Sequence, residues 1–183
     1  LYETNRAPLT GWGMPFANFF DSTVTIENKA RGGRSTRTFI SENRWQPIVD
    51  SLNEGDYVLI QFGHNDEAKE ERYKDRYTPV PDYKTNLIKF ITESRAKKAI
   101  PVLITPVTRM RFDAAGKIQE THIEYSAAVW EVGKAYDVPV IDLGCVHVPV
   151  VHPFLELSRL ANPIFRQSAE HACQLLAKPG VAS

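Results

Sequence analysis

The sequence has few cysteines, no long apolar run and no excess of charge of one sign. Only two of its 183 residues are cysteine, Cys145 and Cys173, and their spacing indicates neither a disulfide framework nor a zinc finger. No stretch approaches the roughly 20 apolar residues of a membrane-spanning helix. Lysine plus arginine total 22, as do aspartate plus glutamate, which predicts no bulk attraction to nucleic acid or to an anionic membrane.

Several motifs that would assign a function are also absent. There is no Gly-Xaa-Gly-Xaa-Xaa-Gly fingerprint and no Walker loop, so nucleotide binding is a weak interpretation. A Gly-Xaa-Ser-Xaa-Gly nucleophile elbow is missing as well. The N-terminus has neither an initiator methionine nor a signal-peptide pattern, which leads us to expect a cut or processed start.

What is present is typical of one globular domain spanning residues 1–183, since 43% of the residues are hydrophobic and 24% are charged. Strand-like and helix-like segments alternate as far as residue 143. This alternation predicts a three-layer α/β/α sandwich with a mostly parallel sheet. The expected strands are 23–27, 57–62, 100–105 and 138–143, and the expected helices are 11–20, 44–52, 82–99 and 121–136.

The helical spacing of apolar residues predicts which helix faces are buried. In helix 82–99 the predicted face is Tyr83, Leu87, Phe90 and Ile91, and in helix 121–136 it is Ile123, Ala127, Trp130 and Ala135. The pattern changes after Leu143. Residues 144–183 are expected to form a divergent C-terminal segment in which only 168–177 has a helical pattern.

Gly63-His64-Asn65-Asp66 follows the apolar strand 57–62, at the edge where open α/β sheets place their ligand crevice. The Asn65 amide could donate a hydrogen bond to an oxygen that develops negative charge, as in an oxyanion hole. A polar turn or a helix cap explains the same residues. Taken alone, the spacing favours the turn.

A second loop, Arg31-Gly32-Gly33-Arg34-Ser35, follows the expected strand 23–27 and so should lie at the same edge of the sheet. A glycine allows its backbone N–H to approach a ligand closely. A solvated turn is again the simpler alternative for this loop by itself. The two loops together are stronger evidence than either alone, because a glycine N–H of this loop and the Asn65 side chain could converge as two hydrogen-bond donors.

These blocks resemble those of the SGNH (GDSL) hydrolase family, and in particular of its rhamnogalacturonan acetylesterases. The resemblance covers residues 11–143 and implies a flavodoxin-like sheet. It also implies serine-dependent removal of acetyl groups from a pectin-type polysaccharide, with Gly33 and Asn65 as the oxyanion hole, no cofactor or metal, and secretion or a periplasmic location. His64 would have a structural role. The blocks are Gly11-Trp-Gly13, Gly33-Arg-Ser35, Gln61-Phe-Gly-His-Asn-Asp66, Thr105-Pro-Val-Thr-Arg109 and Ile141-Asp-Leu143.

Two family blocks are not found in the sequence: the Gly-Asp-Ser nucleophile block that ends the first strand, and the C-terminal Asp-Xaa-Xaa-His block. Ser22 and Ser35 are not convincing substitutes for the nucleophile. The candidate bases His147, His152 and His171 lack the aspartate. We therefore expect a catalytically inactive fragment, with an absent first strand and poor stability or aggregation. The rival hypothesis is a non-catalytic carbohydrate-binding remnant.

Overall fold

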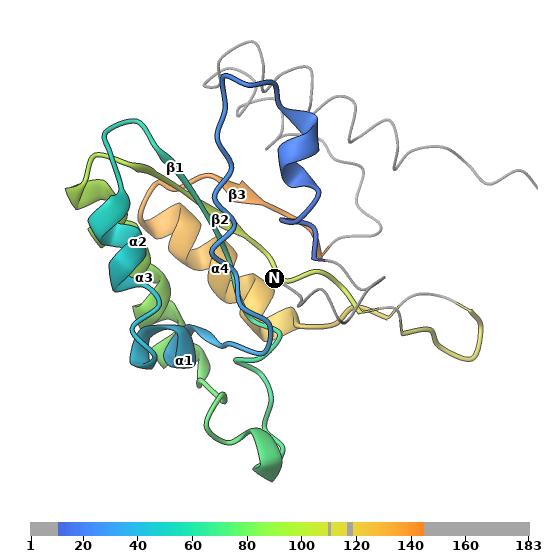
Figure 1. Ribbon diagram of the computed structural model, residues 1–183. Coiled ribbons are helices and arrows are strands. Elements are labelled where there is room, and N and C mark those ends of the chain that lie inside the picture. Colours follow the sequence, from blue (N-terminus) through green and yellow to red (C-terminus); the bar gives the residue numbers. More distant parts are fainter. Residues whose placement is uncertain (1–10, 110, 117–118, 145–183) are drawn as a thin grey trace, which may run out of the picture.

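The computed structural model describes residues 11–109, 111–116 and 119–144, and these contain a parallel sheet of three strands (Figure 1). The strands are β1 (Tyr57–Gln61), β2 (Ile100–Ile104) and β3 (Val140–Ile141), in the order β1-β2-β3. Tyr57 pairs with Ile100, and Leu103 with Val140. The predicted parallel α/β class is confirmed.

Two long helices connect these strands: α3 (Val80–Ala96) joins β1 to β2, and α4 (Ile123–Ala135) joins β2 to β3. Strands that are consecutive in the chain are neighbours in the sheet, so right-handed crossovers place both helices on the same face. In agreement, α3 packs against α4 and both contact β2. The short helix α1 (Thr36–Ser41) packs against α3, and α2 (Gln46–Ser51) lies before β1.

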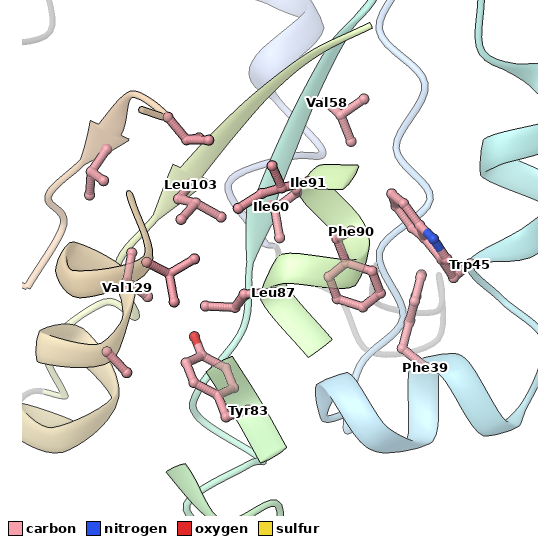
Figure 2. Close-up of a cluster of buried hydrophobic side chains, with 14 of the residues drawn as sticks. Phe39, Trp45, Val58, Ile60, Tyr83, Leu87, Phe90, Ile91, Leu103 and Val129 are labelled. Carbon is pink, nitrogen blue, oxygen red and sulfur yellow. The ribbon is translucent and has the colours of Figure 1, made fainter. Parts of the chain in front are cut away.

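The hydrophobic core lies between this helical layer and the sheet (Figure 2). Tyr83, Leu87, Phe90 and Ile91 of α3 are at most 1% exposed, which confirms the predicted face of that helix. The ring of Phe90 lies 4.5 Å from the ring of Trp45, centroid to centroid. Truncating a buried phenylalanine of this kind to alanine typically costs about 3–5 kcal/mol.

The predicted burial of α4 is wrong. Ile123 is 59% exposed and Trp130 is 38% exposed, and Ala127 and Ala135 are exposed too. The helix turns another face to the core because its contacts with the sheet and with α3 outweigh the preference set by the spacing of its apolar residues. Gly133, with no side chain, lets the helix approach Val140 of β3 closely. The buried residues of α4 are Tyr125, Ala128, Val129, Val132 and Gly133.

The expected strand 23–27 is also wrong. Residues 23–27 form no ladder, and Val24 is 37% exposed. Its β-branched residues favour an extended backbone, but a strand also needs a neighbouring backbone to pair with. Within the described residues, β1 pairs with β2 alone.

The second face of β1 is met by the N-terminal aromatic segment. Val58 and Ile60 are buried in the core, so Gln61 points to the opposite face, where its side-chain oxygen accepts a hydrogen bond of 2.6 Å from the Trp12 indole. The predicted helix 11–20 is realised only as the 3₁₀ turn η2 (Phe16–Phe19). No helix of the described residues is long and apolar enough to span a membrane.

Candidate functional site

The candidate site is built from two loops, one after β1 and one before α1. Gly63, the second residue after β1, has φ +124°, a backbone conformation that favours glycine. The other loop ends at Ser35, which caps α1: its hydroxyl accepts from the Thr38 N–H, and the Thr38 hydroxyl accepts from the Ser35 N–H. Ser35 is fully buried in this role, consistent with its rejection as a nucleophile.

A buried carboxylate joins the two loops. Asp66 Oδ1 accepts hydrogen bonds from the Thr36 N–H (2.9 Å) and hydroxyl (2.5 Å), and Oδ2 accepts one from the Gly63 N–H (3.1 Å). Burial raises the pKa of Asp66, although each of these donors opposes the rise. Tyr125 of α4 donates its hydroxyl to the Asp66 carbonyl as well. The aspartate therefore holds the loop of Asn65 against the start of α1.

This connection brings Asn65 to the loop of Gly33. The Asn65 Nδ2 donates to the carbonyl oxygen of Arg34 at 3.1 Å. An amide nitrogen has two hydrogens, so one N–H of Asn65 remains for a ligand. The Gly33 N–H has no hydrogen-bond partner among the described residues. The structure thus places the two predicted donors on contacting loops.

Arg76, which was not among the predicted site residues, lies against both of them. Its Nη1 is 3.5 Å from Asn65 Oδ1. A Cβ atom built on Gly33 would be 3.3 Å from Arg76 Nη2, and Gly33 has φ +78°. Glycine is therefore favoured at position 33 for two reasons, its backbone conformation and the close guanidinium. A charged residue in a polar surface loop gave no sequence signal for this placement.

His64 packs away from these donors, against a second histidine. Its ring centroid lies 4.1 Å from that of His122, which has φ +63° at the start of α4. Burial, helped by His122 and Arg109, lowers the pKa of His64 to about 4. Burial also lowers the pKa of His122, while Glu67 opposes that shift. These contacts are consistent with a structural role for His64.

The contact between His122 and Glu67 is close but poorly directed. His122 Nδ1 lies 2.7 Å from Glu67 Oε2, yet both ring nitrogens of His122 lack a hydrogen bond of acceptable geometry within the described residues. Glu67 is also 3.2 Å from the Arg109 guanidinium. We interpret the pair as an electrostatic contact, because a hydrogen bond weakens steeply when it is bent.

The ends of β2 and β3 add a further polar group. The Thr105 hydroxyl donates to Asp142 Oδ1 at 2.7 Å and accepts from the Leu143 N–H at 2.7 Å. These bonds use most of the capacity of a hydroxyl. The Thr105 and Asp142 side chains therefore act here as a brace between neighbouring strand ends.

Other surface features do not coincide with the donor pair. One shallow hollow of about 350 Å³ is lined by Arg37, Asp82 and Asn86, among others, and does not include Gly33 or Asn65. We place the candidate site at the donor pair because the two loops that bear these donors are in contact there. The described residues contain no group of three or more His, Cys, Asp or Glu side chains that could hold a metal. Cys145, Cys173, His147, His152 and His171 lie outside the described residues.

Comparison with known proteins gives one family. The chain matches the model of the GDSL-like Lipase/Acylhydrolase family over residues 4–176. It is 44% identical over 140 residues to the rhamnogalacturonan acetylesterase RhgT of Bacillus subtilis, covering 76% of this chain and 58% of that protein. It is 36% identical over 135 residues to the probable rhamnogalacturonan acetylesterase YesY of the same organism, covering 73% and 60%. The chain therefore spans about three fifths of the length of these relatives.

Solved structures agree on the fold. A Bacillus subtilis crystal structure superposes with a TM-score of 0.67 at 21% identity, covering 90% of this chain and 50% of that chain. A catalytic mutant of an acetylxylan esterase from Geobacillus stearothermophilus superposes with a TM-score of 0.50 at 15% identity, covering 82% and 71%. At such identities the likeness establishes the fold alone.

Proposed function

The chain belongs to the GDSL-like Lipase/Acylhydrolase family, and from that premise we propose that it is part of an esterase that removes acetyl groups from a rhamnogalacturonan-type polysaccharide. The names of the two Bacillus relatives support this substrate class. A secreted or periplasmic location would suit an enzyme that meets such a polymer. No cofactor or metal is required by serine-dependent ester hydrolysis.

The observation that carries the proposal is the contact of Asn65 with the loop of Gly33, at 3.1 Å from Nδ2 to the Arg34 carbonyl. In the proposed mechanism a nucleophile attacks the carbon of the acetyl carbonyl. The carbonyl oxygen then acquires negative charge in the tetrahedral intermediate. The Gly33 N–H and the second N–H of Asn65 Nδ2 then donate to that oxygen. Donors that are already fixed in position stabilise the transition state without the cost of reorienting.

The nucleophile and base are assigned to no residue of the printed sequence, which contains neither Gly-Asp-Ser nor Asp-Xaa-Xaa-His. We therefore expect the 183-residue chain to bind acetylated oligosaccharide without releasing acetate. The same absence favours the second candidate function, a carbohydrate-binding protein without ester cleavage. The two candidates share the site and differ in chemistry.

The experiment measures acetate release from acetylated rhamnogalacturonan by the chain alone, and by the chain extended with the flanking segments of the 44%-identical Bacillus relative. The esterase proposal predicts release by the extended protein. It also predicts a loss of about 10²–10³-fold in kcat for Asn65→Ala, the usual effect of removing one oxyanion donor. Asn53→Ala is the matched control, because Asn53 is exposed and distant in the chain from the site.

Three results would contradict parts of this account. Equal turnover by the Asn65→Ala and Asn53→Ala proteins would remove Asn65 from the oxyanion hole. A serine-directed fluorophosphonate that adds mass to a serine of the 183-residue chain would overturn the assignment of the nucleophile outside it. Oligosaccharide binding with no acetate release from the extended protein would favour the binding function.

A further inference from the structure

Arg76 has a charge that no carboxylate of the described residues neutralises. Arg34, Arg37, Arg44 and Arg109 each form an ion pair with an aspartate or glutamate, but Arg76 forms none. Guanidinium stays protonated at every pH at which the protein is folded, so this charge is permanent. A permanent, unpaired cation beside a candidate substrate site favours an anionic ligand.

The surroundings of Arg76 hold its guanidinium in place. One side lies over the Tyr73 ring, with 4.8 Å from Cζ to the ring centroid. Another side contacts Asn65 Oδ1 through Nη1. The side chain is half-buried, so it remains accessible to a ligand while losing part of its hydration. A cation that is already positioned in this way loses little conformational entropy when it binds an anion.

We propose that Arg76 is a specificity-determining residue of this site, and that its guanidinium binds a carboxylate of a uronate residue in the substrate. This inference rests on the proposed function, which places the acetyl carbonyl at Gly33 and Asn65. A group within reach of Arg76 is then on the acetylated sugar or on the next ring. The planar guanidinium can donate two parallel N–H···O bonds to the two oxygens of a carboxylate. A neutral hydroxyl has one oxygen and cannot accept such a pair.

The test compares two ligands that differ at their carboxylates: an acetylated rhamnogalacturonan oligomer and the same acetylated oligomer with its carboxylates methyl-esterified. Their dissociation constants are measured by NMR titration for the chain and for its Arg76→Gln and Arg72→Gln variants. Arg72 is the matched control, because its guanidinium lies over the same Tyr73 ring at 4.5 Å from the centroid and it is exposed. The measurement requires binding only, so it does not depend on catalytic turnover by any of these proteins.

The chain and the Arg72→Gln variant should bind the charged oligomer about 10-fold more tightly than its methyl ester, the ratio expected for one charge-assisted contact. In Arg76→Gln the ratio should fall to about one. Arg76→Lys should keep an intermediate ratio, because it retains the charge and loses the fork. A purely structural role for Arg76 would weaken both ligands equally and leave the ratio unchanged.

Each outcome decides the question. A ratio near one in the unmodified chain, with measurable binding of both oligomers, overturns the role of Arg76 and leaves the proposed function standing. A ratio that persists in Arg76→Gln assigns the preference to another residue and overturns the inference. No binding of either oligomer contradicts the proposed function, and the inference fails with it.

Discussion

Replacing Thr36 with valine tests how the two loops of the site are held together. Valine has nearly the shape of threonine, so the change removes the hydroxyl with little change in volume. Thr36 is fully buried, and its hydroxyl donates to Asp66 Oδ1 at 2.5 Å while accepting from Asn86 Nδ2 at 3.0 Å. The substitution takes one donor from a buried carboxylate and one acceptor from Asn86.

The expected loss of stability follows from these two bonds. A hydrogen bond to a charged group contributes about 1.5–3 kcal/mol, and leaving a partly buried amide without an acceptor costs up to about 1 kcal/mol more. We therefore expect Thr36→Val to lower the free energy of unfolding by about 1.5–4 kcal/mol at pH 7. The deficit should shrink when the pH falls below the pKa of Asp66, because a protonated carboxyl gains less from the lost donor.

The free energy of unfolding is measured by urea denaturation at pH 7 and at acidic pH, with tryptophan fluorescence as the signal. Thr92→Val is the control, since the Thr92 hydroxyl is exposed and donates to the Ile88 carbonyl within α3. That change should alter stability by no more than about 0.5 kcal/mol. If Thr36→Val is equally mild, Asp66 does not hold the loops together as described.

Three further results follow from particular contacts. Gly33→Ala should destabilise the protein by more than Gly116→Ala, because the two have similar φ values of +78° and +76° but only Gly33 faces Arg76; equal losses by urea denaturation would refute the close contact. Gly133→Ala should cost about 1–3 kcal/mol by overpacking α4 against β3, and a loss near zero would show that the helix shifts freely. The lowered pKa of His64 means that the unfolded chain binds the extra proton, so stability should fall as the pH drops from about 6.5 to about 4. His64→Gln should remove about 1 kcal/mol of that pH dependence after allowance for solvent screening, and an unchanged pH profile would exclude His64 as its source.

The sequence predicted the elements whose burial is set by local pattern. Strand β1 was identified from its almost continuous apolar run and helix α3 from the helical spacing of its apolar residues, and Phe90 and Leu87 are indeed buried. The pattern failed for α4, whose buried face depends on how closely Gly133 approaches β3. It failed again at residues 23–27, because a strand requires a neighbouring backbone that composition does not reveal.

The site was predicted only in part. The family resemblance implied Gly33 and Asn65, and the structure brings their loops into contact. The sequence placed Asp66 in the motif that contains Asn65 but assigned it no role. Its part in joining the loops depends on Thr36, a partner 30 residues away. Arg76 was missed because a loop arginine is usually solvated, and only tertiary structure shows that its guanidinium meets Asn65.

The central claim is that an acetylated oligosaccharide binds where the loops of Gly33 and Asn65 meet. The most direct test is an NMR titration of the ¹⁵N-labelled chain with an acetylated rhamnogalacturonan oligosaccharide. We predict that the Gly33 backbone amide and the Asn65 side-chain amide shift most, and that Asn65→Ala weakens binding. Shifts centred instead on the hollow lined by Arg37, Asp82 and Asn86, with Gly33 and Asn65 unmoved, would contradict the account.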